Sequence, residues 1–313
     1  MVAENGNGAE SAPKKQGLFV IGSDNFERAL ELGLYPALAY LVLARGTGRD
    51  HTTTRWRAKS VKDRCRIRWR KAQEAIDALA EAGLVEVPEQ TKERTWPPLR
   101  LAEPEGQEVF LPNSLVDGAG EPNPPLTRIR ETQDPEVLGL LIRIYQHQNL
   151  ADEHGICRDW IWSAGDVEAI TDSREFNIWA GYREGMDYMR WGNPLSEPFK
   201  PDADEFWKRF RVLERLGLVE SVWYVTDSGG ELLFPLDEEV DDAGHDWVEG
   251  QELNSCMGYP DASFLFTTYQ HQAEPGIVGI YRTRYRTHTK MTGEWWQAYS
   301  TMKSEALRRY EIR

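Results

Sequence analysis

Residues 53–87 read TTRWRAKSVKDRCRIRWRKAQEAIDALAEAGLVEV, and this stretch decides the fold. Apolar side chains in its last third recur at steps of three and four residues, which predicts a helix of about four turns with one buried face. Gly83 then stands where a left-handed C-cap would end the helix, and residues 84–87 predict a strand. The side chains of the buried face are Ala72, Ile76, Leu79 and Ala80.

A shorter helix is predicted just upstream, from Ala58 to Cys65, with Val61 and Cys65 facing inward. Only Arg66 and Ile67 separate it from the longer helix, so the two helices must cross sharply. The stretch therefore predicts a helix-turn-helix followed by the first strand of a β hairpin.

The same region is strongly basic, although the chain as a whole is acidic. Between Arg45 and Lys71 there are eleven basic and two acidic residues, a net charge of +9, whereas the whole chain carries −14 and the remainder therefore −23. Solubility does not require this basic island, because the acidic body already has ample charge. A run of charges alone usually marks a solvated face, but its coincidence with a helix-turn-helix favours nucleic-acid binding.

The candidate DNA-contacting residues are the cations and one amide of this region. The first turns of the longer helix would enter the major groove, where Arg can pair with guanine and Gln with adenine, while other cations neutralise phosphates. Two cations of the predicted wing could touch a phosphate or the minor groove, although Glu89 and Glu93 reduce the net positive charge of the wing. The full predicted set is Arg55, Arg57, Lys59, Lys62, Arg64, Arg66, Arg68, Arg70, Lys71, Gln73, Lys92 and Arg94.

Arg68 and Arg70 are predicted to play different roles. Residues two apart on a helix lie about 200° apart around its axis, so both cannot face the base edges. Lys71 shares the face of Arg68, whereas Glu74 shares that of Arg70 and would blunt its reading of guanine. Arg68 is therefore the better candidate for a base contact, and Arg70 for a phosphate contact.

This pattern resembles the winged-helix superfamily over roughly residues 18–111. The order is helix, strand at Thr53–Trp56, helix-turn-helix, and then the ending LAEAGLVEV, which is common where a recognition helix passes into a wing hairpin. The resemblance implies a DNA-binding domain whose wing pairs Val87 with residues 99–101. Winged helices also serve as protein-docking modules, so the resemblance alone does not fix the function.

An internal repeat predicts a second copy of this domain. Trp56-x-Ala58-x-x-Val61 is echoed by the same pattern at residues 162–167, and LAEAGLVE at 79–86 by LERLGLVE at 213–220. The interval from tryptophan to glycine is 27 residues in the first copy and 55 in the second, so we expect a 28-residue insertion that is helical over 176–191. The alternative is that LxxxGLVE is merely a common way for a helix to end before a strand.

The expected fold class is mainly α with small β hairpins, an α+β arrangement of two tandem winged-helix domains and a small C-terminal α+β module. The expected segments are a flexible tail at 1–17, the first winged helix at 18–116, a linker at 117–131, a second winged-helix-like domain at 132–236, an acidic linker at 237–257 and the module at 258–313.

The second copy is expected to contribute less to DNA binding than the first. Asp166 and Glu168 replace Ser60 and Lys62 in its first helix, which would repel phosphates next to the cations Lys208, Arg209, Arg211 and Arg215. Dimerisation or partner docking suits this copy better, and a homodimer could form through it or through the C-terminal module. In that module, Arg282, Arg284 and Arg286 alternate along a strand that would suit nucleic acid or simply be an exposed face.

Composition and motifs exclude several other classes. The three cysteines are widely spaced, and no signal peptide or apolar run near the ~20 residues of a membrane span is present. No phosphate-binding, dinucleotide, zinc-protease or nucleophile-elbow motif occurs, so we expect no enzyme, cofactor or metal. A metal site in the acidic linker is conceivable, but its spacing matches no known loop; it would use Asp241, Asp242, His245 and Asp246.

The sequence is best interpreted as a cytoplasmic, nucleoid-associated protein that binds double-stranded DNA sequence-specifically. A transcriptional regulator of a bacterium or mobile element is the first interpretation. Plasmid and phage replication initiators are similar in having two winged helices in one chain, and they are the second. The third is a winged-helix adaptor whose basic face binds an acidic protein.

Overall fold

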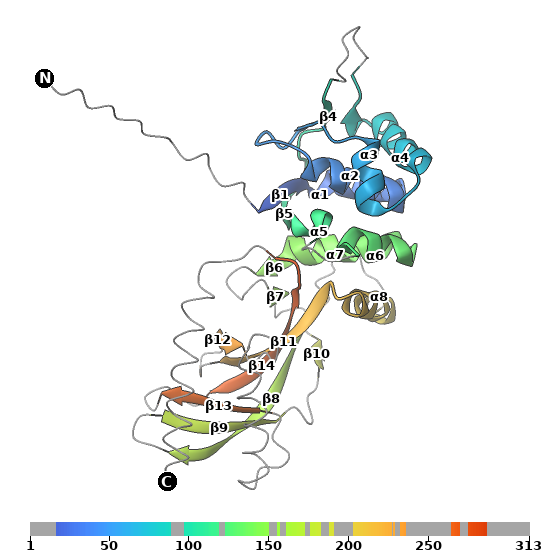
Figure 1. Ribbon diagram of the computed structural model, residues 1–313. Coiled ribbons are helices and arrows are strands. Elements are labelled where there is room, and N and C mark those ends of the chain that lie inside the picture. The colour runs from blue at the N-terminus through green and yellow to red at the C-terminus, as the bar shows by residue number, and fades with distance from the viewer. Residues whose placement is uncertain are drawn as a thin grey trace, which may run out of the picture. The chain divides into compact units, whose positions relative to one another are not determined.

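The computed structural model describes residues 17–88, 97–118, 123–149, 155–156, 161–172, 176–182, 188–190, 203–226, 228, 232–235, 264–269 and 275–286 (Figure 1). The chain divides into two compact units, Met1–Leu126 (unit 1) and Thr127–Arg313 (unit 2). Both units contain helices and antiparallel sheets, so the predicted α+β class is confirmed.

Unit 1 is built around one helix that is buried on almost every side. This helix is α2, Leu34–Arg45, in which the only side chains not buried are Tyr35 and Arg45. A helix that is apolar all round must be covered all round, and α1, α3 and α4 all pack against it (Figure 1). In chain order the elements are β1 Leu18–Gly22, α1 Ser23–Glu31, α2, β2 Thr53–Thr54, α3 Ala58–Cys65, α4 Trp69–Glu81, β3 Val85–Glu86, β4 Leu99–Leu101, β5 Glu108–Pro112 and α5 Ser114–Asp117.

Two small antiparallel sheets complete unit 1. Strands β1 and β5 pair from Leu18↔Pro112 to Gly22↔Glu108, and the second sheet has the order β2-β4-β3. Its hairpin pairs Val85 with Leu101 and Glu86 with Arg100. The predicted hairpin is thus confirmed, with its partner residues shifted from Val87 to the two residues before it.

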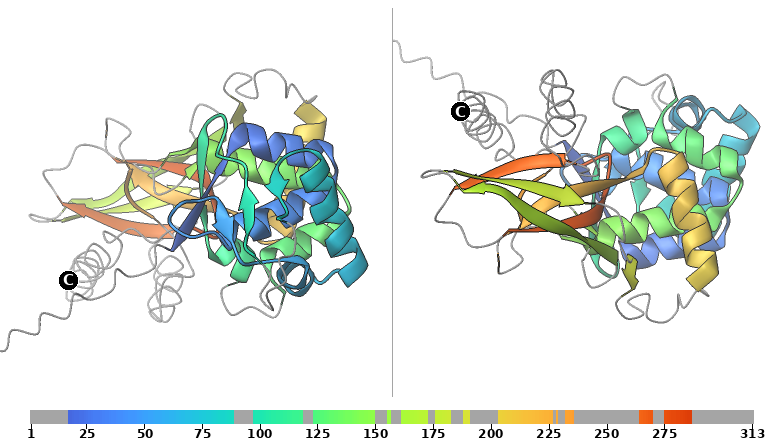
Figure 2. Two further views of the ribbon diagram at one scale, coloured as in Figure 1. Left: turned by 90° about the horizontal axis from the view of Figure 1, so that it is seen from above. Right: turned by 90° about the horizontal axis from the view of Figure 1, so that it is seen from below.

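Unit 2 contains one large antiparallel sheet. The prediction of a mainly α fold with small β hairpins is therefore wrong for this unit. Its path runs β12-β11-β14-β8-β9-β13, while β10 pairs with β8, β7 with β14 and β6 with β7. Strands β8, β11 and β14 extend side by side away from α7 and α8 (Figures 1 and 2). The elements from the boundary between the units onward are α6 Pro125–Thr132, α7 Pro135–His147, β6 Gln148–Asn149, β7 Gly155–Ile156, β8 Ile161–Asp172, β9 Phe176–Tyr182, β10 Tyr188–Arg190, α8 Ala203–Arg215, β11 Val219–Thr226, β12 Leu232–Pro235, β13 Phe264–Tyr269 and β14 Gly276–Thr283.

Both LxxxGLVE segments end a helix in the same way. Gly83 and Gly217 have positive φ angles of 72° and 62°, which glycine adopts without strain. The N–H groups of Leu84 and Leu218 donate to the carbonyls of Leu79 and Leu213 at 2.9 and 3.0 Å, which completes a Schellman motif in each copy. The predicted C-cap is therefore confirmed. In both copies it leads the chain directly from the helix into a strand.

The repeat extends beyond this corner. The C-terminal carbonyl of α4, at Ala82, accepts a hydrogen bond from Arg28 of α1, and that of α8, at Leu216, accepts one from Arg128 of α6. A helix of similar length, α2 or α7, follows each of these arginines. The two units therefore share the helix order α1, α2, α4 and α6, α7, α8, each ending in the same corner.

The predicted second helix-turn-helix is wrong at its first helix. Residues 161–172 form β8, which pairs with β14 on one side and β9 on the other. The pattern Trp-x-Ala-x-x-Val is too short to specify a helix, and the second copy has Gly165 inside it, which disfavours helix. The predicted helical insertion at 176–191 is also wrong, because β9 and β10 lie within it. Strand β9 reads FNIWAGY, and its aromatic and β-branched residues suit a sheet.

The predicted separate module at 258–313 is wrong as well. Strand β14 pairs with β11 from Val219↔Thr283 to Thr226↔Gly276, and β13 pairs with β9. Strand β14 is buried along almost its whole length, as a central strand is. The strands of the expected module thus complete the sheet of the expected second domain.

Candidate nucleic-acid interface

The joint between α3 and α4 is the sharp turn that the sequence predicts. Arg66 adopts a left-handed conformation with φ 51° and ψ 46°, and the Ile67 N–H donates to the Lys62 carbonyl at 3.2 Å. Ile67 is buried and anchors the turn, while Arg68 is the extended N-cap residue of α4. The turn therefore holds the first turn of α4 in a fixed direction relative to α3.

Helix α4 has one buried face and one exposed face. Its buried side chains are Ala72, Ala75, Ile76 and Leu79, in agreement with the predicted stripe except that Ala75 replaces the half-buried Ala80. Arg68, Trp69 and Arg70 are exposed at its N-terminus. The unpaired N–H groups there give that end a partial positive charge, which attracts phosphate.

Arg70 and Glu74 share a face, as predicted. Their side chains lie 3.4 Å apart at the ion pair and are 86% and 60% exposed. A pair this exposed contributes little stability, so its main effect is to lower the local positive charge beside Arg70.

Two other predicted base-reading residues of α4 already have partners. The Gln73 amide donates to Asp77 at 2.8 Å, and the Lys71 ammonium lies 4.3 Å from the ring centroid of Tyr35 on α2. The first contact holds the Gln73 side chain along α4, and the second holds the Lys71 side chain against α2. Arg68 is exposed, and within the described residues no ion pair holds it.

Asp117, at the end of α5, holds two arginines of the basic region. Its carboxylate accepts from Arg45 at 2.6 and 2.9 Å and from Arg64 at 3.2 Å. The two guanidinium groups also lie over the Trp56 ring, at 5.5 Å for Arg45 and 3.6 Å for Arg64. We call these four residues the Asp117 cluster; it keeps Arg64, a predicted DNA contact, folded against unit 1.

Arg57 is likewise committed to the fold. It is the N-cap residue of α3, and its guanidinium donates to the carbonyl of Pro97, just before β4. Burial lowers the pKa of this guanidinium. Arg57 therefore ties the helix-turn-helix to the small sheet.

The remaining predicted cations that the structure describes are exposed. Lys62 lies 3.7 Å from Asp63 in a pair that is about half exposed on both sides. The other exposed cations on or next to α3 and α4 are Arg55, Lys59, Arg66, Arg68, Arg70 and Lys71. Lys92 and Arg94 lie outside the described residues, so the predicted wing contacts stay predictions.

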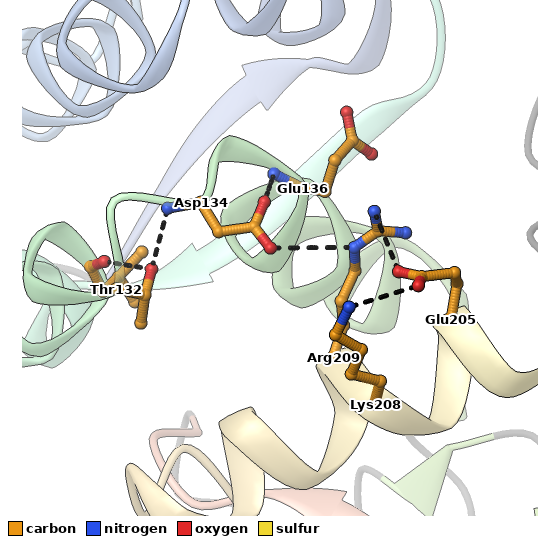
Figure 3. A network of polar contacts seen from close by, with 7 residues as sticks. Thr132, Asp134, Glu136, Glu205, Lys208 and Arg209 are labelled. Atoms are coloured by element: carbon orange, nitrogen blue, oxygen red, sulfur yellow. Dashed lines mark hydrogen bonds and ion pairs between the residues drawn. The ribbon is translucent and has the colours of Figure 1, made fainter.

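Several cations of unit 2 that the sequence offered as secondary candidates are engaged within the unit. Figure 3 shows Arg209 of α8 between Asp134, at 3.8 Å, and Glu205, at 3.5 Å, with Lys208 also bound to Glu205 at 3.2 Å. Asp134 in turn caps α7 by accepting from the Glu136 N–H at 2.9 Å, and its own N–H donates to the Thr132 hydroxyl at 3.2 Å (Figure 3). Arg209 thus joins α8 to the start of α7.

Of the three arginines predicted to alternate along one strand face, Arg284 is exposed and lies just after β14, whereas Arg282 and Arg286 are held within unit 2. Arg282 is only 7% exposed and donates to Glu220 at 2.7 Å and to the Tyr224 hydroxyl at 2.8 Å. Arg286 donates to the same carboxylate at 2.8 Å. We call Glu220, Tyr224, Arg282 and Arg286 the Glu220 cluster; it lies across β11 and the end of β14.

Among the described residues, no group of three or more His, Cys, Asp or Glu side chains is placed to bind a metal ion. The conceivable metal site at 241–246 lies outside the described residues. None of the helices within the described residues combines the length and apolar composition that a bilayer span needs. Comparisons of the chain with family models, curated proteins and solved structures find no match.

Proposed function

We propose that the chain binds double-stranded DNA sequence-specifically through the N-terminus of α4 and acts as a transcriptional regulator. The observation that carries the proposal is the exposed first turn of α4, where Arg68 stands at the positive end of a helix whose other face is buried. The sharp α3–α4 turn supports it, because a recognition helix must project its N-terminal residues into the major groove.

The order of elements in unit 1 also supports a winged helix. Helix α2, strand β2, helices α3 and α4, and strands β3 and β4 follow one another, and the three strands form one sheet in the order β2-β4-β3. A helix-turn-helix followed by a hairpin that pairs with the preceding strand is the arrangement that we expect of that fold. A DNA-bound protein of this kind would be cytoplasmic and associated with the nucleoid.

The replication-initiator alternative receives less support than the regulator. It depended on two helix-turn-helix segments, and residues 161–172 of the second one form a strand. The ion pairs that hold Lys208 and Arg209 of α8 within unit 2 likewise favour a single DNA-reading unit, although Arg211 and Arg215 are exposed. For the adaptor alternative, the test is whether unit 1 binds DNA at all.

We expect Arg68→Ala and Arg70→Ala to weaken DNA binding in different ways. A duplex of high affinity is first selected from a randomised 30-base-pair library, and a scrambled duplex serves as reference. Arg68→Ala should cost ~1–3 kcal/mol on the selected duplex and lower the ratio of selected to scrambled affinity, because a base contact is lost. Arg70→Ala should weaken both duplexes equally and reduce the salt dependence by about one phosphate contact.

Fluorescence anisotropy at several salt concentrations measures both effects. Lys208→Ala is the matched control, since it removes an exposed cation of unit 2 that pairs with Glu205, and it should change neither quantity. If Arg68→Ala leaves the ratio of selected to scrambled affinity unchanged, α4 does not read bases at that position. If the wild type binds no duplex, the adaptor interpretation replaces the proposal.

Asp117→Asn should strengthen non-specific DNA binding. The change removes the carboxylate that holds Arg45 and Arg64, so both guanidinium groups become available to phosphates. Each added phosphate contact steepens the slope of log affinity against log salt concentration by about 0.9. Two added contacts would therefore steepen this slope by up to about 1.8.

Glu31→Gln is the control for Asp117→Asn, because it removes one exposed negative charge of α1 without releasing an arginine. Salt titrations on a random duplex compare the two variants. Equal salt slopes for both would show that the Asp117 cluster does not withhold its arginines from DNA.

A further inference from the structure

Trp69, the first residue of α4, is the most exposed large apolar side chain among the described residues of unit 1. It is 53% exposed, and it stands between Arg68 and Arg70 at the end of the helix that carries the positive partial charge. An indole left in water forgoes the free energy of burial, which for a large side chain amounts to a few kcal/mol. The exposure of this indole between two exposed arginines is therefore a feature that the fold alone does not account for.

The position of Trp69 on α4 explains how this exposure arises. Ala72 and Ile76 follow it at three and seven residues, so Trp69 continues the buried stripe towards the N-terminus. Side chains on a helix lean towards its N-terminus. The indole consequently extends beyond the end of the core that buries Ala72 and Ile76, in the direction in which α4 would enter a groove.

We infer that Trp69 contacts the 5-methyl group of a thymine in the major groove of double-stranded DNA. This inference rests on the proposed DNA binding by α4. The thymine methyl is the one apolar group that the edges of the four bases present in that groove. The indole of Trp69 lies in the first turn of the inserted helix, with a cation on each side. The thymine methyl group is therefore the only apolar group that it can contact there.

Duplex DNA fits this side chain better than an unpaired base does. An α-helix with its side chains is about 10–12 Å across, and the major groove is about 12 Å wide, so a helix fills the groove. A ring held on the first turn of that helix approaches the edges of the bases, where the methyl groups lie. Stacking would instead require the flat face of a base that has left the helix.

The experiment compares the selected 30-base-pair duplex with the same duplex in which uracil replaces every thymine. This replacement removes only the methyl groups. The wild type should bind the thymine duplex about four-fold more tightly, which is the value of one buried methyl group. Trp69→Ala should bind the two duplexes with equal affinity, and circular dichroism should show that it retains its helices.

Phe110→Ala is the matched control, because Phe110 is an aromatic side chain on β5 of the same unit that is 49% exposed. It should keep the four-fold preference for thymine. The inference is overturned if the wild type binds both duplexes equally, or if Trp69→Ala retains the preference, although DNA binding itself would stand in either case. It is also overturned if Trp69→Ala weakens binding to the isolated single strand more than to the duplex. Absence of binding to any DNA would instead overturn the proposed function.

Discussion

Glu220→Gln should lower the free energy of unfolding by about 3 kcal/mol at neutral pH, because it leaves Arg282 as a buried cation without its carboxylate. Arg282 is 7% exposed and Glu220 28%, so the low end of the range for a buried pair applies. The Tyr224 hydroxyl would remain as a neutral partner of Arg282. Urea titration of the wild type and the variant measures the difference.

The same variant should reveal a pH dependence. Burial raises the pKa of Glu220, but the hydrogen bonds and charges of Arg282 and Arg286 outweigh burial and hold it below its ordinary value of 4.5. A carboxyl group with a lowered folded-state pKa contributes stability that is complete above the unfolded-state pKa and is lost as the pH falls through the folded-state pKa. The difference between wild type and variant should therefore be constant near neutrality and shrink below a pH of about 4.5.

Glu205→Gln is the control for this prediction. Glu205 also pairs with two cations, Lys208 and Arg209, but its side chain is 44% exposed. Its removal should cost less than ~1 kcal/mol, as exposed ion pairs do. Equal losses from Glu220→Gln and Glu205→Gln would mean that the Glu220 cluster is no more important than a surface pair.

Leu84→Ala and Leu218→Ala should each lower the free energy of unfolding by about 2–5 kcal/mol, since each removes most of a fully buried side chain and leaves a cavity. The two leucines are 0% and 1% exposed and follow Gly83 and Gly217 at equivalent corners. Leu32→Ala, at a leucine that is 42% exposed, should cost under ~0.5 kcal/mol. A loss that small at either buried leucine would show that its corner is not a packed core.

The sequence predicts the helices of unit 1 closely because their signals are local. The apolar spacing and the short joint between Cys65 and Arg68 define α3 and α4, and Gly83 marks the end of α4. The same local signal identifies the second corner at Gly217. A Schellman motif is formed by six consecutive residues, so it can be inferred without knowing what packs around it.

The parts that the sequence does not predict depend on distant contacts. Arg45 and Arg64 are 72 and 53 residues from Asp117, so no spacing rule connects them. Strand β14 becomes a central strand only because β8 and β11 lie on either side of it. The apolar character of 162–170 is compatible with a helix or a strand in isolation, and the sheet decides between them.

The sequence also does not predict the exposure of Trp69 directly, although a signal for it exists. It stands three residues before Ala72 on the buried stripe, which suggests core, but it is the first residue after the N-cap. At a helix end, periodicity specifies the direction of a side chain without specifying whether anything lies there to cover it.

The shared corner has different consequences for how each unit forms. In unit 1, Val85 pairs with Leu101, sixteen residues further along the chain, whereas in unit 2 Val219 pairs with Thr283, sixty-four residues further along. Closing a loop four times as long costs about 1.2 kcal/mol more in chain entropy, and long-range pairing slows folding. During synthesis, the hairpin of unit 1 can close while β14 has still to leave the ribosome. Strand β11 cannot pair with β14 until that strand has been synthesised. Until then, one edge of β11, a largely apolar strand, stays unpaired.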